Sequence, residues 1–461
     1  MFRALSSLLL LCSIGQSIPI IKIGHSILID ITNRTIFNTT QSKCICEMLT
    51  LNGLISAINY FSINQTCQLF TSNNTSIVVD FSPISSLIFI NRTEILITNY
   101  MITSTTSSTT STTTNGCSSM LLSQTIYSIG NGTNYVAIDD INGDMKLDIL
   151  TANTGSNNMG VLQNKGNGTF YPATLYTVGT RPYAVVTGDL NNDNKSDVAV
   201  TNNGVANIGI LINKGDGTFY PQYTLSTYGS PNPIVIIDIN NDNLSDILYA
   251  SWYTTTVNIF FNKGNATFSP QTSYTVGTNP FVIQVIDINN DHLLDILVAN
   301  QGSNSISILI SGGNGSFLPQ TILSVGSGIV PRAFVAGDLN GDNISDIITA
   351  NADSNTVSVF INRGNGTFFN QVSYSVRDKP FAIKIYDMNF DNKPDVIVAN
   401  YLSNNIGILI NQGDGTLFNQ TTFAVGINPS SLAIVDINED NKPDVIVTNY
   451  GSNNVGILLH C

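Results

Sequence analysis

The chain has 461 residues, of which only 11% are charged, and its formal net charge is −13. This length allows one large domain and a smaller one. The acidic balance argues against a nucleic-acid-binding protein, because there is no basic patch to neutralise phosphates.

The N-terminus has the features of a secretory signal peptide, which we predict over residues 1–17. Arg3 supplies a positive charge, and a short apolar core from Leu5 to Ile14 ends among small residues. The alternative, a membrane anchor, is disfavoured because this apolar run is much shorter than a bilayer span. We therefore expect a secreted chain in an oxidising compartment, with no transmembrane segment after processing.

Sequons for N-glycosylation agree with export and predict a glycoprotein. In a chain rich in Asn and Thr, some sequons arise by chance. The Asn-x-Ser/Thr sequons include Asn33, Asn38, Asn64, Asn91, Asn131, Asn167, Asn265, Asn314, Asn365 and Asn419.

Residues 18–102 are expected to form a small module that contains Cys44, Cys46 and Cys67. The segment Lys43–Phe70 has a C…C…NYF…C-x-L pattern and resembles a reduced apple/PAN module, although the Cys expected near Leu54 is missing. Cys67 can pair with Cys46 or with Cys44, which leaves one thiol free or paired between chains.

Residues 103–116 are rich in Ser and Thr, have no apolar periodicity and cannot pack a core. They are either an O-glycosylated stalk or an unmodified flexible linker, and in both cases they mark a domain boundary.

A repeat fills the remaining residues, 117–461. Two of its copies read YAVVTGDLNNDNKSD from Tyr183 and FAIKIYDMNFDNKPD from Phe381. Self-similarity at this period is typical of a propeller or a solenoid. The first Asp of a repeated loop recurs every 49 residues, apart from one spacing of 51 before the fifth loop, at Asp140, Asp189, Asp238, Asp287, Asp338, Asp387 and Asp436.

Each unit contains four short β runs and no helical periodicity. Four strands in each of seven units predict an all-β fold, a seven-bladed β-propeller with four-stranded blades. In the second unit the runs are Tyr183–Thr187, Asp197–Thr201, Ile208–Ile212 and, after a Gly-rich turn at Lys214–Gly217, Phe219–Thr227.

The last unit ends after its third run, Val455–Leu459, whereas a run that matches a fourth strand, Leu121–Ile129, precedes the first unit. We predict that this N-terminal strand completes the last blade and removes its exposed edge. The alignment also places Cys117 and Cys461 opposite each other across a tight turn. We predict a disulfide between them that stabilises the ring by about 4 to 6 kcal/mol.

The repeated loop reads Asp-x-Asn-x-Asp-x-x-x-Asp, which puts side-chain oxygens at positions 1, 3, 5 and 9. Ca²⁺ prefers six to eight oxygen ligands, including carboxylates and backbone carbonyls such as the one at position 7. We predict up to seven structural Ca²⁺ ions. The expected ligands at positions 1, 3, 5, 7 and 9 of successive loops are Asp140, Asn142, Asp144, Lys146, Asp148; Asp189, Asn191, Asp193, Lys195, Asp197; Asp238, Asn240, Asp242, Leu244, Asp246; Asp287, Asn289, Asp291, Leu293, Asp295; Asp338, Asn340, Asp342, Ile344, Asp346; Asp387, Asn389, Asp391, Lys393, Asp395; and Asp436, Asn438, Asp440, Lys442, Asp444.

The alternative is seven Asx-type turns that bind no metal. Charge favours metal sites, because 21 of the 31 acidic residues are these Asp residues, three in each of seven loops. Crowded carboxylates repel unless a cation lies among them. Seven Ca²⁺ ions would bring the net charge from −13 to about +1.

Position 6 of each loop is expected to need a left-handed backbone, which Gly and Asn tolerate best. Met145 and His292 occupy this position in two loops, so we expect the loops that begin at Asp140 and Asp287 to bind Ca²⁺ most weakly.

These loops, a Pro before the first run of each unit and G-[DN]-G-[TS]-F turns such as Gly215–Phe219 resemble the FG-GAP/VCBS repeat family, which includes the integrin α-subunit propeller. The first unit departs from this pattern, with Asn134 at the Pro position. The prolines are Pro182, Pro233, Pro280, Pro331, Pro380 and Pro429. The resemblance implies metal loops on one face and ligand binding on the opposite face. There, Trp252–Tyr253 is either a partner or sugar anchor or a packing substitution between blades.

We expect an extracellular binding or adhesion protein with structural calcium and a protein or glycan ligand. The alternatives are a lectin and a carbohydrate-active lyase or hydrolase on a propeller scaffold. No catalytic residue is predicted, since His25, His292 and His460 occupy non-equivalent positions. A glycosidase would also need two carboxylates not used for calcium. The plausible ones within the propeller are Asp139, Asp353 and Asp378.

Overall fold

The computed structural model describes residues 119–461 and, before them, only a set of short strands. The chain divides into two compact units, Met1–Gly116 and Cys117–Cys461. The predicted signal-peptide processing, the pairing of Cys44, Cys46 and Cys67, and the 103–116 linker lie outside the described residues and stay predictions.

The first unit contains three small antiparallel sheets, with strand orders β1-β4, β2-β3-β8-β9 and β5-β6-β7. The strands are β1 Leu8–Ser13, β2 Ile20–Ile23, β3 Ser26–Asp30, β4 Ile45–Thr50, β5 Ala57–Tyr60, β6 Thr66–Phe70, β7 Ser76–Asp80, β8 Leu87–Ile90 and β9 Ile95–Leu96.

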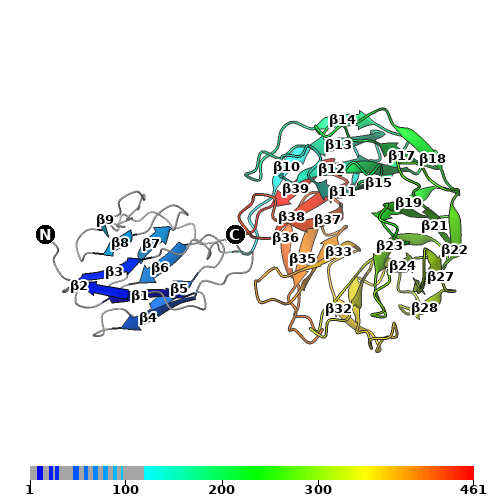
Figure 1. Ribbon diagram of the computed structural model, residues 1–461. Helices are drawn as coiled ribbons and strands as arrows, with labels where there is room; N and C mark the ends of the chain where they lie inside the picture. Colours follow the sequence, from blue (N-terminus) through cyan, green and yellow to red (C-terminus); the bar gives the residue numbers. More distant parts are fainter. Residues whose placement is uncertain are drawn as a thin grey trace. The chain divides into compact units, whose positions relative to one another are not determined.

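The second unit is a ring of seven four-stranded antiparallel sheets, each radiating from a central axis (Figure 1). This confirms the predicted all-β, seven-bladed propeller. The first four blades are β11 Thr133–Asp139, β12 Asp148–Asn153, β13 Asn158–Leu162, β14 Thr174–Thr177; β15 Pro182–Gly188, β16 Asp197–Asn202, β17 Asn207–Leu211, β18 Tyr223–Ser226; β19 Pro231–Ile237, β20 Asp246–Ser251, β21 Thr256–Phe260, β22 Thr272–Thr275; and β23 Pro280–Ile286, β24 Asp295–Asn300, β25 Ser305–Leu309, β28 Thr321–Ser324. The fourth blade also carries a small hairpin, β26 Ser311–Gly313 and β27 Ser316–Phe317. The last three blades are β29 Pro331–Gly337, β30 Asp346–Asn351, β31 Thr356–Phe360, β32 Val372–Ser375; β33 Pro380–Tyr386, β34 Asp395–Asn400, β35 Asn405–Leu409, β36 Thr421–Ala424; and β37 Pro429–Val435, β38 Asp444–Asn449, β39 Asn454–Leu458 with β10 Thr125–Ser128.

The core of the propeller lies between neighbouring blades. The second strand of every blade, for example β16, is buried along its whole length because other blades cover both of its faces. Seven hydrophobic clusters result, one at each interface; Leu150 and Met159 of the first blade, for instance, pack with Val185 and Val198 of the second. The outermost strands are mostly exposed, with one half-buried side chain each. Each blade thus depends on both of its neighbours.

The ring closes as the sequence predicts. Strand β10 pairs antiparallel with β39, so that Ile126 lies opposite Gly456, and Leu121 forms a further bridge with His460. Cys461 takes part in a disulfide bond. Its predicted partner, Cys117, lies outside the described residues, so the pairing itself stays a prediction.

Two details of the predicted pattern are wrong. The fourth run was expected over Phe219–Thr227, but β18 covers only Tyr223–Ser226, and Phe219 makes a single isolated bridge because the chain turns between them. The first strands also begin seven residues before the loop Asp. The Pro position is therefore Thr133 in the first blade and Pro231 in the third, not Asn134 and Pro233.

Across the described part of the chain, no helix is long and apolar enough to cross a membrane.

Candidate metal loops and central cavity

The seven Asp loops lie at one face of the propeller. Each joins the end of an innermost strand to the start of the second strand, as the loop Asp189–Ser196 joins β15 to β16. Because every blade repeats this strand order around the ring, all loops emerge on the same side. The residues predicted to bind metal therefore form seven separate sites in a circle.

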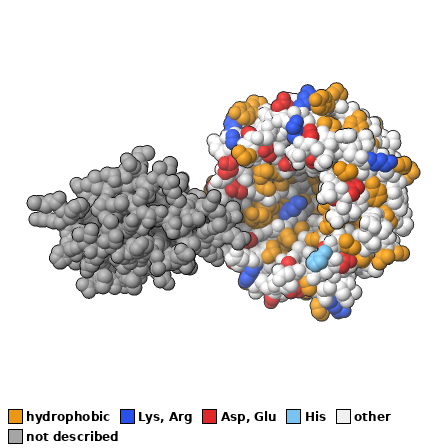
Figure 2. Space-filling model, in the orientation of Figure 1, with side chains coloured by type: hydrophobic (Ala, Val, Ile, Leu, Met, Phe, Trp, Pro, Cys, Tyr) orange, Lys and Arg blue, Asp and Glu red, His pale blue; other side chains and the backbone are white. Residues whose placement is uncertain are grey.

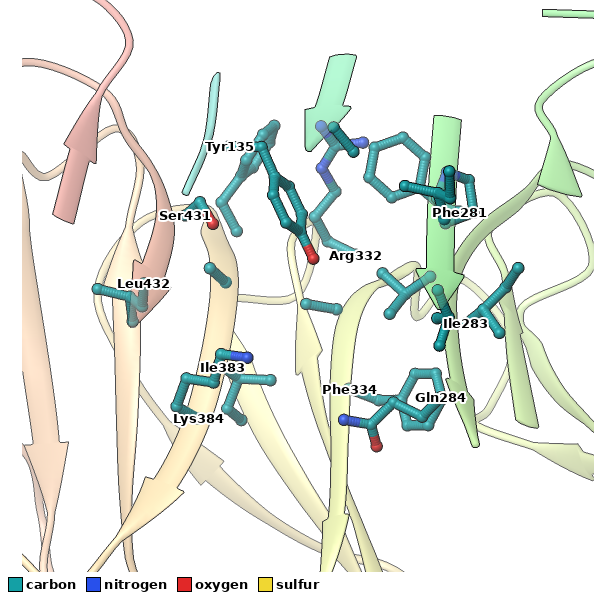
Figure 3. A pocket seen from close by; sticks show the side chains of 18 of the residues that line it. Tyr135, Phe281, Ile283, Gln284, Arg332, Phe334, Ile383, Lys384, Ser431 and Leu432 are labelled. Atoms are coloured by element: carbon teal, nitrogen blue, oxygen red, sulfur yellow. The ribbon is translucent and has the colours of Figure 1, made fainter. Parts of the chain in front are cut away.

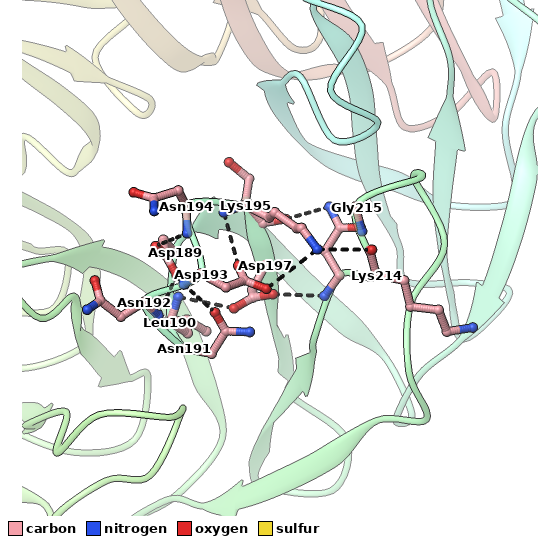
Figure 4. A network of polar contacts seen from close by, with 12 residues as sticks. Asp189, Leu190, Asn191, Asn192, Asp193, Asn194, Lys195, Asp197, Lys214 and Gly215 are labelled. Carbon is pink, nitrogen blue, oxygen red and sulfur yellow. Dashed lines mark hydrogen bonds and ion pairs between the residues drawn. The ribbon is translucent and has the colours of Figure 1, made fainter.

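Side-chain oxygens hold each loop in shape, as Figure 4 shows for the second blade. Asp189, at position 1, accepts hydrogen bonds from the backbone N–H groups of Asp193 (3.2 Å) and Asn194 (2.8 Å). Asn191 Oδ1 accepts from the Asp193 amide at 2.9 Å, and Asp193 Oδ1 accepts from the Lys195 amide at 3.0 Å. Positions 1, 3 and 5 thus cap amide groups of their own loop.

Asp197, at position 9, ties the loop to the blade. Its Oδ1 accepts the backbone N–H of Asn213 at 2.8 Å, and its Oδ2 accepts that of Leu190 at 3.1 Å. Burial raises the pKa of Asp197 to about 6, although the two amides lower it, and Asp193 and Asp189 raise it further. A nearby cation would stabilise the ionised form of a carboxyl group that is desolvated in this way. The equivalent residues are equally buried: Asp148, Asp246, Asp295, Asp346, Asp395 and Asp444.

The chemistry of the loops fits Ca²⁺, because positions 1, 3, 5 and 9 all offer oxygen. Within residues 119–461, however, no group of three His, Cys, Asp or Glu side chains lies close enough together to hold a metal ion. The position-5 carboxylates face other donors instead: Lys195 Nζ lies 3.8 Å from Asp193 Oδ2, and Asn240 Nδ2 donates to Asp242 Oδ2 at 2.9 Å. Calcium coordination by these residues stays a prediction.

The backbone is left-handed at two positions of each loop, whereas the sequence predicted only one. Position 6 has φ between 61° and 68° in all seven loops, as expected, including Met145 and His292. Position 4, which the sequence reasoning missed, also has positive φ throughout: Gly143, Asn192, Asn241, Asn290, Gly341, Phe390 and Glu439. Phe390 and Glu439 suit this backbone poorly. Strain is therefore also expected in the two loops to which they belong.

Replacing Glu439, which is exposed and has a φ of 64°, tests this strain. We expect Glu439→Gly to raise the free energy of unfolding by about 0.5–1 kcal/mol, because Gly adopts positive φ without a Cβ clash. Chemical denaturation measures the difference. Asn241→Gly, at the same position of another loop, is the control and should change stability less. A loss of stability in Glu439→Gly would contradict the assignment of backbone strain to Glu439.

A bridge of Asn side chains joins neighbouring blades behind the loops, and the sequence reasoning did not single it out. Asn213 Nδ2 donates to Ile141 O of the preceding blade at 2.7 Å and to Ser196 O of its own loop at 3.0 Å. The repeat itself carried the signal, since the equivalent bridging residues are Asn164, Asn262, Asn362 and Asn411. His460 replaces Asn in the last blade and places Nε2 2.9 Å from Met388 O. In the fourth blade Ser311 takes this place, and its hydroxyl accepts the Gly313 amide instead.

We expect Asn213→Ala to lower the free energy of unfolding by about 1–3 kcal/mol, because two buried carbonyls lose their donor. Ser311→Ala is a matched control, since Ser311 forms no hydrogen bond to the preceding blade among the described contacts. The free energy of unfolding should fall less in this variant than in Asn213→Ala. Urea denaturation compares the two variants, and equal losses would argue against the bridge.

The Gly-rich turn lies against the loop of the preceding blade. Gly217 has a φ of 76°, and a Cβ there would lie 3.3 Å from Asn142 Cβ and 2.5 Å from Gln163 Nε2. The second Gly of this turn is therefore needed for contact between blades as well as for the backbone.

Trp252 and Tyr253 lie in the turn between β20 and β21, at the face opposite the loops. The Trp252 ring packs edge-on against Phe281 of the next blade, with centroids 5.2 Å apart. Tyr253 is 80% exposed. Trp252 thus fits the packing alternative, and Tyr253 alone is fully available to a partner.

A cavity of about 450 Å³ lies inside the ring and is lined by residues of the innermost strands. Figure 2 shows the hollow at the centre of the ring, with a basic side chain in it. Figure 3 shows Tyr135, Arg332 and Lys384 on different strands around the cavity. Arg332 and Lys384 are the cations of the lining, and none of its described residues is acidic.

The chain is a repeat β-propeller, defined by its four-stranded blades, the Asp loops on one face and the axial cavity. Such a scaffold suits binding proteins and enzymes. Six overlapping matches to the model described as FG-GAP-like repeat cover residues 140–200, 189–249, 238–298, 287–349, 338–398 and 387–447. The chain belongs to the FG-GAP-like repeat family. No curated protein matches the sequence.

Solved structures share the fold at low identity. BBS1N in complex with ARL6DN is similar with a TM-score of 0.55 and 14% identity, over 74% of this chain and 98% of that one. Virginiamycin B lyase from Staphylococcus aureus has a TM-score of 0.53 and 13% identity, over 73% and 99%. A putative 6-phosphogluconolactonase from Bacteroides fragilis has a TM-score of 0.52 and 16% identity, over 66% and 87%. These likenesses concern the fold alone.

Proposed function

We propose that the chain is a secreted, calcium-binding propeller that acts as an extracellular binding or adhesion module. The observation that carries this proposal is the set of seven in-register loops, each with a fully buried Asp at position 9 among other carboxylates. Bound Ca²⁺ would offset this charge and compete with contacts such as that between Lys195 and Asp193. Calcium is then structural, and the opposite face takes the protein or glycan ligand.

Exposure of the sequons supports secretion as a glycoprotein. The propeller's sequon residues outside the metal loops are all exposed: Asn131, Asn167, Asn265, Asn314, Asn365 and Asn419. Cys461 in a disulfide also suits an oxidising compartment.

A calcium titration followed by thermal melts, with and without chelator, tests the proposal. We expect the melting temperature to rise with Ca²⁺, because binding to the folded state alone stabilises it by several kcal/mol at saturation. Mg²⁺ at the same concentration is the control and should stabilise less, since it demands a tighter octahedral site. An unchanged melting temperature in chelator would defeat the calcium assignment.

A catalytic role has less support than binding. Asp139 ends β11 at the loop face, whereas Asp353 and Asp378 lie in turns at the opposite face. A seven-residue strand separates these faces by about 20 Å, so Asp139 cannot pair with Asp353 or Asp378 within the roughly 10 Å that two glycosidase carboxyl groups allow. Glycan-array binding without turnover would indicate a lectin, and product release from a polysaccharide would indicate an enzyme.

A further inference from the structure

Two basic side chains reach the central cavity without any acidic partner. Arg332 lies near the start of β29, and Lys384 lies in the second half of β33. In a chain with a formal net charge of −13 this is an unexpected place for unpaired positive charge. None of the described hydrogen bonds or ion pairs involves the Lys384 ammonium group.

Arg332 is held flat between two aromatic rings. Its guanidinium carbon lies 3.6 Å from the centroid of the Phe281 ring and 3.7 Å from that of Phe381. Stacking on both faces leaves only the in-plane N–H edge for hydrogen bonds. On that edge one amino group reaches Tyr183 Oη at a long 3.5 Å, and Nε has no partner. The residue is rigid, desolvated and short of acceptors.

Lys384 is open to the cavity and yet surrounded by the ring. Desolvation by the surrounding strands lowers the pKa of its ammonium group, while the side chain keeps accessible surface inside the cavity. A cation enclosed in this way and without an acidic partner is stabilised when an anion binds beside it. Apolar side chains, including Ile234, Ile283 and Leu432, form much of the remaining wall.

We propose that the central cavity binds a small organic anion, whose carboxylate meets the in-plane edge of Arg332 and whose body packs on the apolar wall. Lys384, three strand positions further along the cavity, supplies a second positive charge. The free in-plane edge of a guanidinium matches the planar fork of a carboxylate. The volume of about 450 Å³ is within the range of small-ligand pockets. This inference goes beyond the proposed function, because it adds a ligand site inside the ring to the face proposed to take the protein or glycan ligand.

The chain carries its own reporter of binding. Trp252 is the only Trp in the sequence, and its ring packs on Phe281, which covers one face of Arg332. An anion that contacts Arg332 should therefore change the Trp252 fluorescence. The full chain is titrated with 3-phenylpropionate and with its neutral amide, and in parallel with a tripeptide that ends in a free Phe carboxylate and with its C-terminal amide.

The expected result is a saturable fluorescence change with at least one carboxylate and none with its amide. Response to the small acid would indicate a free metabolite, and response to the tripeptide alone would indicate a peptide C-terminus. Lys384→Met should weaken binding by at least about tenfold, whereas Lys263→Met, at an exposed site away from the cavity, should not change it. Without ligand, Lys384→Met should melt no lower than the wild type, because it removes an unpaired charge.

The proposal is overturned if neither carboxylate binds, if amides bind equally well, if Lys384→Met binds as tightly as the wild type, or if inorganic phosphate binds more tightly than the carboxylates. Its failure is distinguishable from failure of the proposed function. Calcium-dependent stability can persist without anion binding, and a Lys384-dependent response can persist in a protein that calcium does not stabilise.

Discussion

Loss of the two buried side chains that flank β10 will open the propeller. Leu121 is 3% exposed and packs with Met388 and Leu458, while Ile129 is 1% exposed and packs with Val455. Each Leu or Ile to Ala change in a core lowers stability by about 2–5 kcal/mol. The double variant Leu121→Ala/Ile129→Ala should therefore lose about 4–10 kcal/mol if the sites are independent, comparable to the whole stability of many domains.

Ile126→Ala is the matched control, because Ile126 lies in the same strand but is 53% exposed. It should change the free energy of unfolding by less than about 1 kcal/mol. Denaturation followed by circular dichroism compares the variants, and size-exclusion chromatography reports association through the newly exposed edge of β39. If the double variant unfolds like the control, β10 does not close the ring.

Removing the position-9 carboxylate will destabilise the protein even without calcium, whereas removing the position-5 carboxylate will not. Asp197→Ala leaves the buried N–H groups of Asn213 and Leu190 without acceptors. Each orphaned group costs about 1–3 kcal/mol, so a total loss of about 2–6 kcal/mol is expected in chelator. Asp193 is partly exposed and accepts only a loop amide and a lysine contact.

The two variants separate the structural role of the loop from its proposed metal role. With calcium present, Asp193→Ala should reduce the calcium-dependent rise in melting temperature, while in chelator it should melt close to the wild type. Asp197→Ala should melt lower in both conditions. If Asp193→Ala reduces the melting temperature equally with and without calcium, position 5 does not bind the ion.

Most of the propeller could be predicted because its information is periodic. The pairing of β10 with β39 could be predicted from three features of the sequence: the 49-residue spacing, the incomplete last unit and the run around Ile126. Strand ends were harder, since Phe219 fits a β pattern but lies in a turn where the chain changes direction. Pro233 was the wrong choice for the third unit, since the 49-residue period from Pro182 leads to Pro231. The pairing of Pro231 with Ser251 confirms this position.

The cavity could not be predicted from the repeat, because its chemistry lies where the units differ. Arg332, Phe281 and Phe381 occupy equivalent positions of three blades, so a repeat alignment shows them as unrelated substitutions. Only the closed ring brings both Phe rings onto the guanidinium. The Asn213 bridge is the opposite case: it recurs in the sequence, but its contact with Ile141 crosses to another blade.

The pairing of β10 with β39 also constrains how the protein is made. Ile126 and Gly456 are about 330 residues apart, so a ribosome adding 5–20 residues per second needs roughly 15–70 seconds between them. During that time the early blades exist as an open arc with an unpaired edge. A chain that crosses a membrane during synthesis would therefore complete its ring only on the far side, and chaperones that shield strand edges would act on this arc rather than on the finished protein.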